Sequence, residues 1–276
     1  MARKKQPKQS KGGFLLLTIV IVAALYFFQN SEQSVSKAVA VVNNSISGGK
    51  LELPTDKTER EEIRLNKTGF TVSYNNDYKT PYWVAWELTS QETSGEEDRK
   101  DKFYPDPELP EPRAEHSDYT NSGYDRGHMA PAADMKWSEK AMEESFYMSN
   151  ICPQNQKLNR DDWGDLEEAC RSWAQKYGSV YIACGPIYDS KSPKRIGEHK
   201  VAVPDRFFKV VLITSTSTPI AMGFLFDNKA HHQALKNYMV TVDEVETATG
   251  LDFFPLLPDD VEDKIEATVP ALPSTK

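Results

Sequence analysis

A segment near the middle of the chain places an aspartate, an arginine and a histidine within four residues, at Asp125, Arg126 and His128. If this segment is extended, alternate side chains share a face, so Arg126 and His128 point the same way. The intervening Gly127 has no Cβ, which permits a close approach of a substrate backbone or an unusual φ. A histidine that accepts a proton beside a fixed cation suits phosphodiester cleavage, where a proton leaves water while negative charge grows on phosphorus. The segment alone does not decide the chemistry.

A second polar cluster follows at residues 149–154 and continues through Asn159, Trp163 and Glu167. The last three are spaced i, i+4, i+8. On a single helix each of these steps advances about 40°, so the three side chains would share one face. Taken alone, Glu167 reads as an exposed helix carboxylate and Trp163 as a packing residue.

The two clusters together resemble the motifs of the DNA/RNA non-specific endonuclease family, the endonuclease G-like ββα-metal nucleases. The family's Asp-Arg-Gly-His block is similar to residues 125–128, and its Ser-Asn-x-x-Pro-Gln block to residues 149–154. Its Asn-x-x-x-Trp-x-x-x-Glu block is similar to residues 159–167, and the Thr-Gly-Leu-Asp-Phe-Phe-Pro run at 249–255 also resembles the family. The resemblance covers roughly residues 66–258 and implies an α+β fold, the ββα-metal nuclease fold, with a central antiparallel sheet flanked by helices.

The resemblance implies a catalytic base and a metal site. His128 would be the general base, since neutral imidazole near pH 7 can take the proton of an attacking water. Asn159 would be the direct protein ligand of Mg²⁺, with Mn²⁺ as a substitute, because such a water-rich oxygen site suits a hard divalent cation. Glu167 would not contact the metal itself but would accept a hydrogen bond from a water molecule bound to it.

Arginines are the candidates for stabilising the transition state. Arg126 is one, and the family has another arginine upstream, in an Arg…Phe…Asp-Pro setting. Here Arg99, Phe103 and Asp106-Pro107 match that setting loosely, and Arg113 is a rival for the same role.

Three further polar residues in the motifs are expected to position other groups. Asp125 is expected to orient the strand or Arg126 without touching the substrate. Asn150 and Gln154 are expected to position substrate or neighbouring groups through hydrogen bonds, and Trp163 to pack.

The charge of the chain limits how it can bind a polyanion. The formal net charge is −8 over 276 residues. The first 31 residues carry five basic and no acidic side chains, which leaves 28 basic against 41 acidic residues in the rest, or −13. This balance argues against a broad basic surface. A few cations around one phosphate must therefore hold the substrate. Binding of the protein to the rest of the polymer is then expected to be weak and sensitive to salt.

The three cysteines, Cys152, Cys170 and Cys184, form no CxxC pair, which argues against a zinc site. An odd number permits at most one disulfide. Cys170–Cys184 is one pairing, and buried free thiols are the alternative.

The amino-terminal part predicts a membrane anchor. Residues 1–11 are basic and expected in the cytoplasm, and residues 12–31 are uncharged and long enough as a helix to cross a bilayer. We expect an uncleaved transmembrane signal anchor, which places the rest of the chain on the exported side, periplasmic, extracellular or in an intermembrane space. Cleavage after the tripeptide 38–40 is the alternative. Residues 32–65 are predicted to be a flexible linker, 66–258 the nuclease domain and 259–276 a disordered tail.

Period-two and helix-capping patterns give the expected elements. Strands are expected at 70–74, 82–88, 179–184, 200–203, 207–214 and 221–226. Helices are expected at about 139–148, about 160–177 and between Thr241 and Gly250. Residues 90–123 are expected to be a long surface loop that leads into the histidine segment.

The sequence thus predicts a membrane-anchored, metal-dependent endonuclease that hydrolyses DNA and RNA with little sequence specificity. A catalytically inactive nucleic-acid-binding or uptake protein is one alternative, and a phosphodiesterase on small nucleotide substrates is another. Homodimerisation is left open.

Overall fold

The computed structural model describes residues 50–275. The predicted basic segment 1–11, the predicted signal anchor 12–31 and the first part of the predicted linker lie outside the described residues. Across 50–275, no helix combines the length and the apolar character that a membrane crossing requires.

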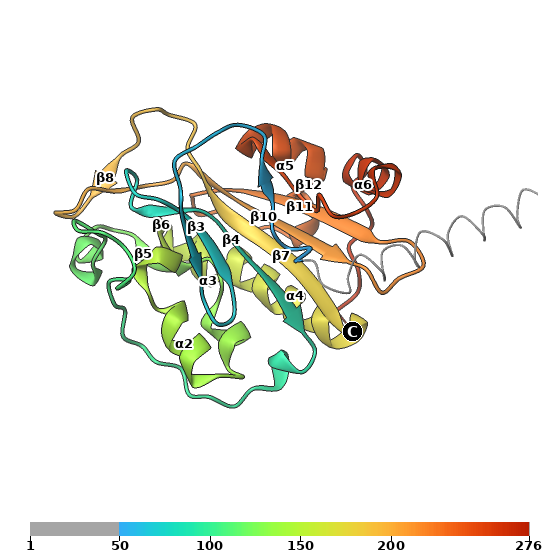
Figure 1. Cartoon of the computed structure of the whole chain (residues 1–276), viewed down its shortest axis with the longest axis horizontal. Coiled ribbons are helices and arrows are strands. Elements are labelled where there is room, and N and C mark those ends of the chain that lie inside the picture. Colours follow the sequence, from blue (N-terminus) through green and yellow to red (C-terminus); the bar gives the residue numbers. More distant parts are fainter. Residues whose placement is uncertain (1–49, 276) are drawn as a thin grey trace, which may run out of the picture.

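A seven-stranded antiparallel sheet forms the centre of the fold (Figure 1), as the sequence predicts. Its strands lie in the order β12-β11-β10-β7-β4-β3-β2. Their bounds are β2 Ile63–Asn66, β3 Thr71–Asn75, β4 Thr80–Thr89, β7 Ser179–Ile187, β10 Arg206–Ile213, β11 Ile220–Asp227 and β12 Met239–Val240.

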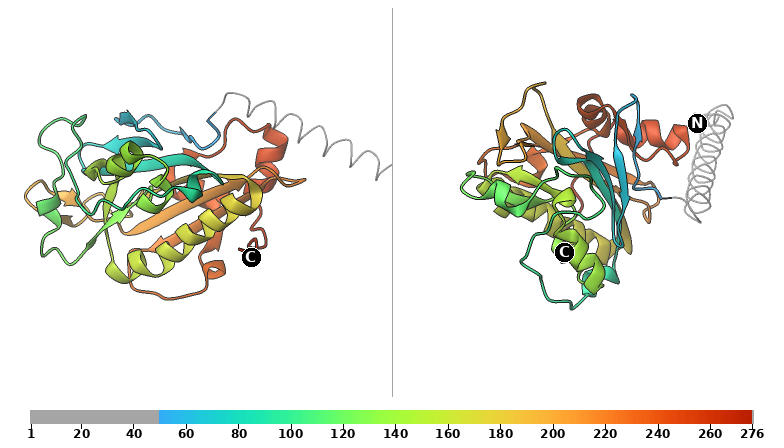
Figure 2. Two further views of the ribbon diagram at one scale, coloured as in Figure 1. Left: turned by 90° about the horizontal axis from the view of Figure 1, so that it is seen from below. Right: turned by 60° about the vertical axis from the view of Figure 1, so that its left-hand side comes forward.

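Helices cover both faces of this sheet (Figure 2). The helices are α2 Glu139–Ser145, α3 Gln156–Arg160, α4 Asp162–Tyr177, α5 Val242–Thr249 and α6 Asp259–Glu266. The short strand pairs are β1 Thr55–Asp56 with β13 Leu251–Asp252, β5 Asp125–His128 with β6 Ile151–Gln154, and β8 Arg195–Ile196 with β9 Val201–Ala202. The 3₁₀ turns are η1 Glu92–Ser94, η2 His116–Tyr119, η3 Ala132–Met135, η4 Met148–Asn150 and η5 Leu235–Asn237.

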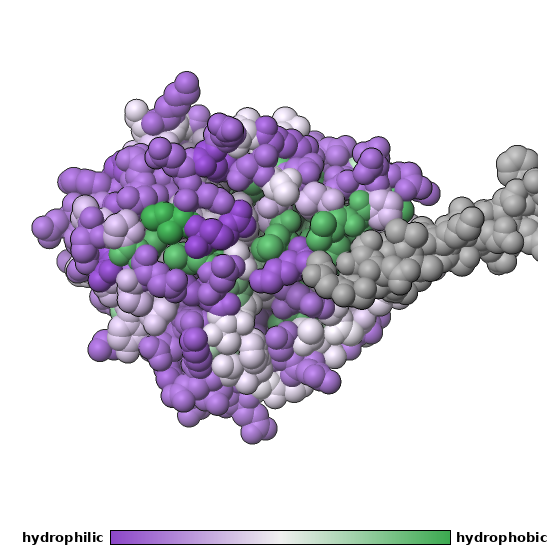
Figure 3. Space-filling view, in the orientation of Figure 1, coloured by the Kyte–Doolittle hydropathy of each residue, from purple (hydrophilic) through white to green (hydrophobic). Residues whose placement is uncertain are grey.

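Alternation along the central strands divides the apolar side chains between two cores. On β4, Val84 and Trp86 pack in the cluster that contains Trp163 of α4. Their neighbours Trp83 and Ala85 pack in the cluster that contains residues of α5 and α6. Each strand residue therefore faces the layer opposite to that of its neighbours, because successive side chains of a strand point to opposite faces. The outer surface seen in Figure 3 is mostly hydrophilic, with small apolar areas.

Two of the expected helices form where their capping residues predict. Ser138 accepts a hydrogen bond from the backbone N–H of Ala141 and begins α2, which ends at Ser145 rather than at 148. Thr241 and Glu244 form the expected capping box at the start of α5. Gly250 ends α5 with φ of 71°, a left-handed conformation that glycine adopts without steric cost.

The helix predicted at about 160–177 forms as α4, and a further short helix, α3, ends just before it. Asp161, with φ of −104° and ψ of −99°, separates α3 from α4. Asn159 therefore lies on α3, whereas Trp163 and Glu167 lie on α4, and the single helix face predicted for them is wrong. The side chain of Asn155 caps α3, a signal that the regular spacing of the motif concealed.

The predicted linker and tail are packed where the structure describes them. Leu51 is fully buried, β1 pairs with β13, and β2 forms an edge of the central sheet, so residues 50–65 are part of the domain and not a flexible stalk. At the other end, α6 lies on the sheet, and the Pro273 carbonyl accepts a hydrogen bond of 3.0 Å from Trp173 Nε1. The disorder predicted for residues 259–276 is therefore wrong over the described part of that range.

Cys152, Cys170 and Cys184 are buried free thiols, so the alternative with no disulfide holds. Burial raises the pKa of Cys184 to about 12 and that of Cys170 to about 12, which keeps both thiols protonated and inert.

Candidate active site

The antiparallel pairing of β5 and β6 brings the two sequence motifs together. Asp125 lies opposite Gln154, and His128 lies opposite Ile151. The chain beyond His128 is fixed by Asn150, whose Oδ1 accepts from the Ala130 N–H at 2.9 Å and whose Nδ2 donates to the Ala130 carbonyl at 2.8 Å. Asn150 is fully buried, so its hydrogen bonds position protein backbone.

Gly127 makes room for the side chain of Gln154. A Cβ at this glycine would lie 2.1 Å from Gln154 Oε1 and 2.6 Å from Gln154 Cβ, distances that no pair of non-bonded atoms tolerates. Gln154 is fully buried, and neither atom of its amide group has a hydrogen-bond partner among the described residues. The glycine of the motif therefore serves close packing between β5 and β6.

Replacement of Gly127 by alanine is expected to destabilise the fold by about 1–3 kcal/mol, the usual cost of overpacking, and to slow cleavage by displacing His128. Gly164 in α4 is the matched control. The nearest atom to a Cβ there is the Asn159 carbonyl oxygen at 3.6 Å, an ordinary contact, so Gly164→Ala should be neutral or stabilising. Chemical denaturation of both variants measures the difference, and equal stability of the two would contradict the packing argument.

His128 lies in an aromatic enclosure. Its ring packs edge-on against Phe146 at 4.9 Å and tilted against Phe103 at 5.4 Å, both between centroids. The residue is 8% exposed, and its Nε2 is buried without a hydrogen-bond partner among the described residues. Burial and the positive charge of Arg99 lower the pKa of His128 to about 3, which keeps the imidazole neutral.

Arg126 shares a face of β5 with His128, which confirms the prediction from strand alternation. The guanidinium of Arg126 lies 5.7 Å from the centroid of Phe103, the ring that also packs against His128. One Arg126 nitrogen donates to the backbone carbonyl of His116 at 2.8 Å and lies 3.1 Å from Nε2 of the same histidine. These contacts fix the guanidinium beside the catalytic candidate.

The contacts of the two rival upstream arginines differ. Arg99 pairs with Asp101 at 2.9 Å and lies over the ring of Phe146 at 5.2 Å, and its charge acts on His128. Arg113 instead donates to the Leu109 carbonyl at 3.0 Å and pairs with Glu111 at 3.0 Å. The geometry therefore favours Arg99 as the arginine next to the histidine.

Asn159 is oriented by Asp125. The amide Nδ2 of Asn159 donates to Asp125 Oδ2 at 3.2 Å, and the guanidinium of Arg160 donates to both oxygens of the same carboxylate, at 2.8 and 3.0 Å. A carboxylate only accepts hydrogen bonds, so the amide nitrogen must face it and Oδ1 of Asn159 is left to coordinate a cation. Arg160 offsets the charge of Asp125. A partly exposed amide oxygen of this kind fits a hard divalent cation that keeps several waters.

Trp163 joins α4 to the strand that carries the histidine. Its ring is fully buried against Phe207 and Phe226, which agrees with the packing role predicted from the sequence. Its Nε1 donates to the backbone carbonyl of His128 at 3.3 Å. This contact ties the backbone of His128 to α4.

Glu167, one turn further along α4, lies in a charged environment that the sequence did not reveal. Burial, followed by the nearby charge of Asp134, raises the pKa of Glu167 to about 7, although Lys209 and Arg171 oppose the shift. Glu167 therefore titrates close to neutral pH.

Sequence reasoning missed the aromatic rings and the buried cation that surround these residues. Phe103 belongs only to the loose upstream motif, and Phe146 belongs to none of the motifs. Lys209 is fully buried with its ammonium 4.2 Å from the ring centroid of Trp163. A lone lysine in the apolar strand run Phe207–Ile213 was the available signal, since an unpaired lysine is rarely buried.

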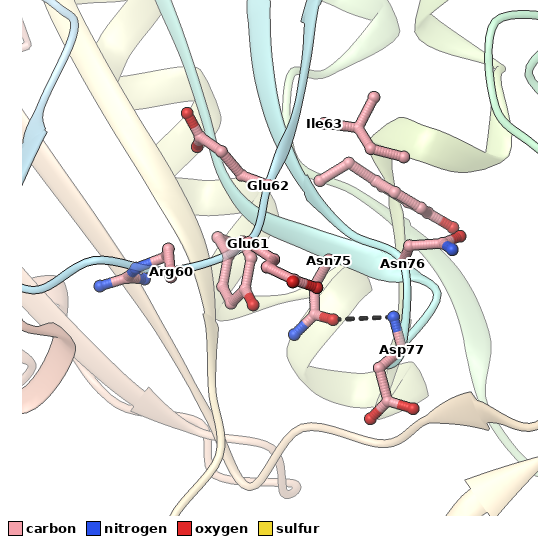
Figure 4. Close-up of a pocket in the computed structure, with 9 residues that line it drawn as sticks. Arg60, Glu61, Glu62, Ile63, Asn75, Asn76 and Asp77 are labelled. Carbon is pink, nitrogen blue, oxygen red and sulfur yellow. Dashed lines mark hydrogen bonds between the residues drawn. The ribbon is translucent and has the colours of Figure 1, made fainter.

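A cavity of about 850 Å³ lies elsewhere, between the segment before β2 and the turn after β3 (Figure 4). Two of its charged lining residues pair with neighbours outside the lining: Arg60 with Asp56 at 2.6 Å, and Glu62 with Arg64 at 2.7 Å. None of the residues described above lines it, so the cavity is not part of the candidate active site.

The site thus has two antiparallel strands followed by a helix, with His128 on the first strand and Asn159 on the helix. This arrangement is the one expected of a ββα-metal nuclease centre. The family model for DNA/RNA non-specific endonucleases matches residues 47–260. The chain belongs to the DNA/RNA non-specific endonuclease family.

Several relatives are similar over most of this chain. The mitochondrial nuclease EXOG of Danio rerio is 42% identical over 207 residues, which cover 69% of this chain and 60% of that protein. Human mitochondrial endonuclease G is 33% identical over 204 residues, covering 69% of each chain, and a nuclease of Nostoc sp. is 34% identical over 252 residues, covering 87% of this chain and 89% of that protein. A chain in the crystal structure of the EndoG/EndoGI complex matches with a TM-score of 0.68 at 30% identity, covering 73% of this chain and 89% of that chain.

Proposed function

We propose that the protein is a Mg²⁺-dependent endonuclease that hydrolyses phosphodiester bonds of DNA and RNA without marked sequence preference. The observation that carries this proposal is the neutral, buried imidazole of His128, which stands beside two arginines and whose Nε2 has no hydrogen-bond partner within residues 50–275. A base and fixed cations at one point suit attack of water on a phosphodiester. The family membership supports the same reaction.

In this proposal His128 takes the proton of the attacking water. A histidine with a pKa of about 3 in the free protein is a weak base. The negative charge of a bound phosphodiester opposes the effect of Arg99 and raises this pKa, so the base strengthens when substrate binds. Arg126 and Arg99 then face the charge that grows on the phosphate oxygens during attack.

Asn159 holds the divalent cation in this proposal, and Asp125 keeps its amide in the required orientation. When bound, Mg²⁺ would stabilise the charge that develops on the leaving 3′ oxygen. Glu167, placed by α4, would hold a water ligand of that cation, and the buried ammonium of Lys209 opposes the rise in its pKa.

The acidic composition of the chain accords with local recognition of the backbone phosphate. With few cations engaged, binding to a polymer is weak at physiological salt and falls further as salt rises. The membrane anchor predicted at residues 12–31, the exported location and a homodimer stay predictions, and the names of several relatives place those proteins in mitochondria.

Cleavage of three substrates tests the proposed function against its alternatives. Supercoiled plasmid and a structured RNA are both expected to be cut at internal positions in Mg²⁺, whereas a small diester such as bis-p-nitrophenyl phosphate should react far more slowly. Preference for the small diester would favour the small-substrate phosphodiesterase. Binding of plasmid without any nicking would favour the inactive receptor.

A further inference from the structure

Three carboxylates converge on the helical layer that lies across the sheet from α4. Asp243 and Glu246 belong to α5, and Glu266 is the last residue of α6. One oxygen atom from each residue lies within 4.8 Å of the other two. Since calcium–oxygen bonds measure about 2.3–2.6 Å, one ion between these oxygens could contact all three.

Glu266 points into this cluster without a protein partner. The residue is 4% exposed, and its Oε1 is buried with no hydrogen bond to any residue that the structure describes. Glu262, one turn earlier on α6, also has a buried Oε1 without a partner in the described part of the chain. Buried carboxylate oxygens are normally hydrogen-bonded or paired, so each of these atoms requires an explanation.

The charged groups around the cluster do not explain why these buried oxygen atoms are unpaired. Lys57 is the basic group at the cluster, with Nζ 2.7 Å from Glu246 Oε2 and 3.4 Å from Asp252 Oδ1. The other oxygen of Glu246 accepts from the Phe253 N–H at 2.8 Å. This ammonium and backbone amide satisfy Glu246 and leave Glu266 without a counter-charge.

Mutual repulsion adds to the cost of burying these carboxylates. Burial, with the nearby charges of Glu246 and Glu262, raises the pKa of Glu266 to about 9. Burial and the charges of Asp252 and Glu246 raise the pKa of Glu262 to about 7. Among the described residues, neither carboxyl group has a positive partner that would hold its pKa low.

We propose that Asp243, Glu246 and Glu266 bind a calcium ion that links α5 to α6. Ca²⁺ takes six to eight oxygen ligands in flexible geometry and accepts several carboxylates, with water completing the shell. Mg²⁺ demands a near-ideal octahedron and gives up its waters reluctantly, so it fits this carboxylate cluster less well. The ion would be structural, because α5 and α6 lie on the opposite face of the sheet from α4 (Figure 2).

Thermal unfolding of the full chain, stripped of metal with EDTA and dialysed, tests this proposal. Ca²⁺ at a hundredfold excess over its Kd should raise the Tm by roughly 5–10 °C, and Mg²⁺ at the same concentration should raise it less. Isothermal titration calorimetry should show Ca²⁺ binding at this site. No rise in Tm with Ca²⁺, or an equal rise with Mg²⁺, would overturn the assignment.

Variants separate this site from the candidate active site. Glu266→Gln keeps the shape of the side chain but removes a charged ligand, so the rise in Tm with Ca²⁺ should be lost while nicking in Mg²⁺ continues. Glu168→Gln, an exposed carboxylate on α4, is the matched control and should keep the full rise. Asn159→Ala should also keep it. If Asn159→Ala lost the rise and Glu266→Gln kept it, calcium would bind at the active site and the proposal would be wrong.

Discussion

Replacement of His128 by alanine is expected to lower the rate of plasmid nicking by about 10²–10⁴, the range for loss of a general base. The ring is neutral and buried, and its Nε2 has no hydrogen-bond partner in the part of the chain that the structure describes. Arg126 and Arg99 cannot replace it, because a guanidinium does not accept a proton near neutral pH. Single-turnover cleavage at saturating substrate isolates the chemical step. Circular dichroism and the unfolding midpoint must show that the variant is folded.

A second substitution separates the chemical role of the ring from its packing. His128→Gln fills part of the same space and retains a hydrogen-bonding group, yet offers no base, so it should be as inactive as the alanine variant. Near-normal nicking by either folded variant would refute the assignment of His128.

The same variant has an expected effect on acid stability. The pKa of His128 is lowered to about 3 in the folded protein, against about 6.5 in an unfolded chain. The unfolded chain therefore binds a proton between about pH 6.5 and pH 3 that the folded protein does not bind. The contribution of His128 to stability is complete above pH 6.5 and falls as the pH decreases through this window, by at most about 1.4 kcal/mol per pH unit.

Because glutamine does not titrate, the unfolding free energy of His128→Gln should fall less steeply than that of the wild type between pH 6 and pH 4. Urea unfolding at several pH values measures both slopes. Identical slopes would mean that the imidazole is protonated in the folded protein, which would contradict the burial argument.

Removal of the metal is expected to have the other large effect. EDTA should abolish cleavage, and Mg²⁺ or Mn²⁺ should restore it, whereas Zn²⁺ prefers tetrahedral nitrogen and sulfur ligands and should restore little. Asn159→Ala should stay inactive even at high Mg²⁺, because the oxygen that Asp125 aims at the cation is gone. Full activity after exhaustive chelation would exclude the metal mechanism.

Glu167→Gln gives the comparison that distinguishes a direct ligand from a supporting group. This variant keeps the shape of the side chain and loses its charge, so it should retain a reduced rate that still depends on Mg²⁺. If high Mg²⁺ rescued Asn159→Ala completely while Glu167→Gln were inactive, the roles proposed for the two residues would have to be exchanged.

Most of the sheet could be predicted because its strands carry local signals. Tyr82 to Leu88 alternates in a way that predicts a strand, and the observed β4 spans Thr80–Thr89. The capping residues Ser138 and Thr241 likewise fixed two helix starts, since a cap acts within one turn. The pairing of β5 with β6 was not predicted from the sequence, because it depends on contacts between segments that are distant in the chain.

The predictions that the structure contradicts share a physical cause. Residues 50–65 look like a linker because they are polar, yet β1 finds its partner on β13 almost 200 residues later, and no local pattern reports such a contact. The break between α3 and α4 at Asp161 leaves no trace in the motif, because the even spacing of Asn159 and Trp163 continues across it. Lys209 could have been noticed, but its place beside Trp163 follows only from the packed fold.

The pairing of Thr55 with Asp252 joins the two ends of the described domain. A ribosome that makes about 5–20 residues per second needs roughly 10–40 s to add the chain between these partners. Throughout that time β1 has no strand to pair with, and the segments that carry His128 and Asn159 are made before the interval ends. The nascent chain therefore completes its catalytic segments before it can close the domain that holds them.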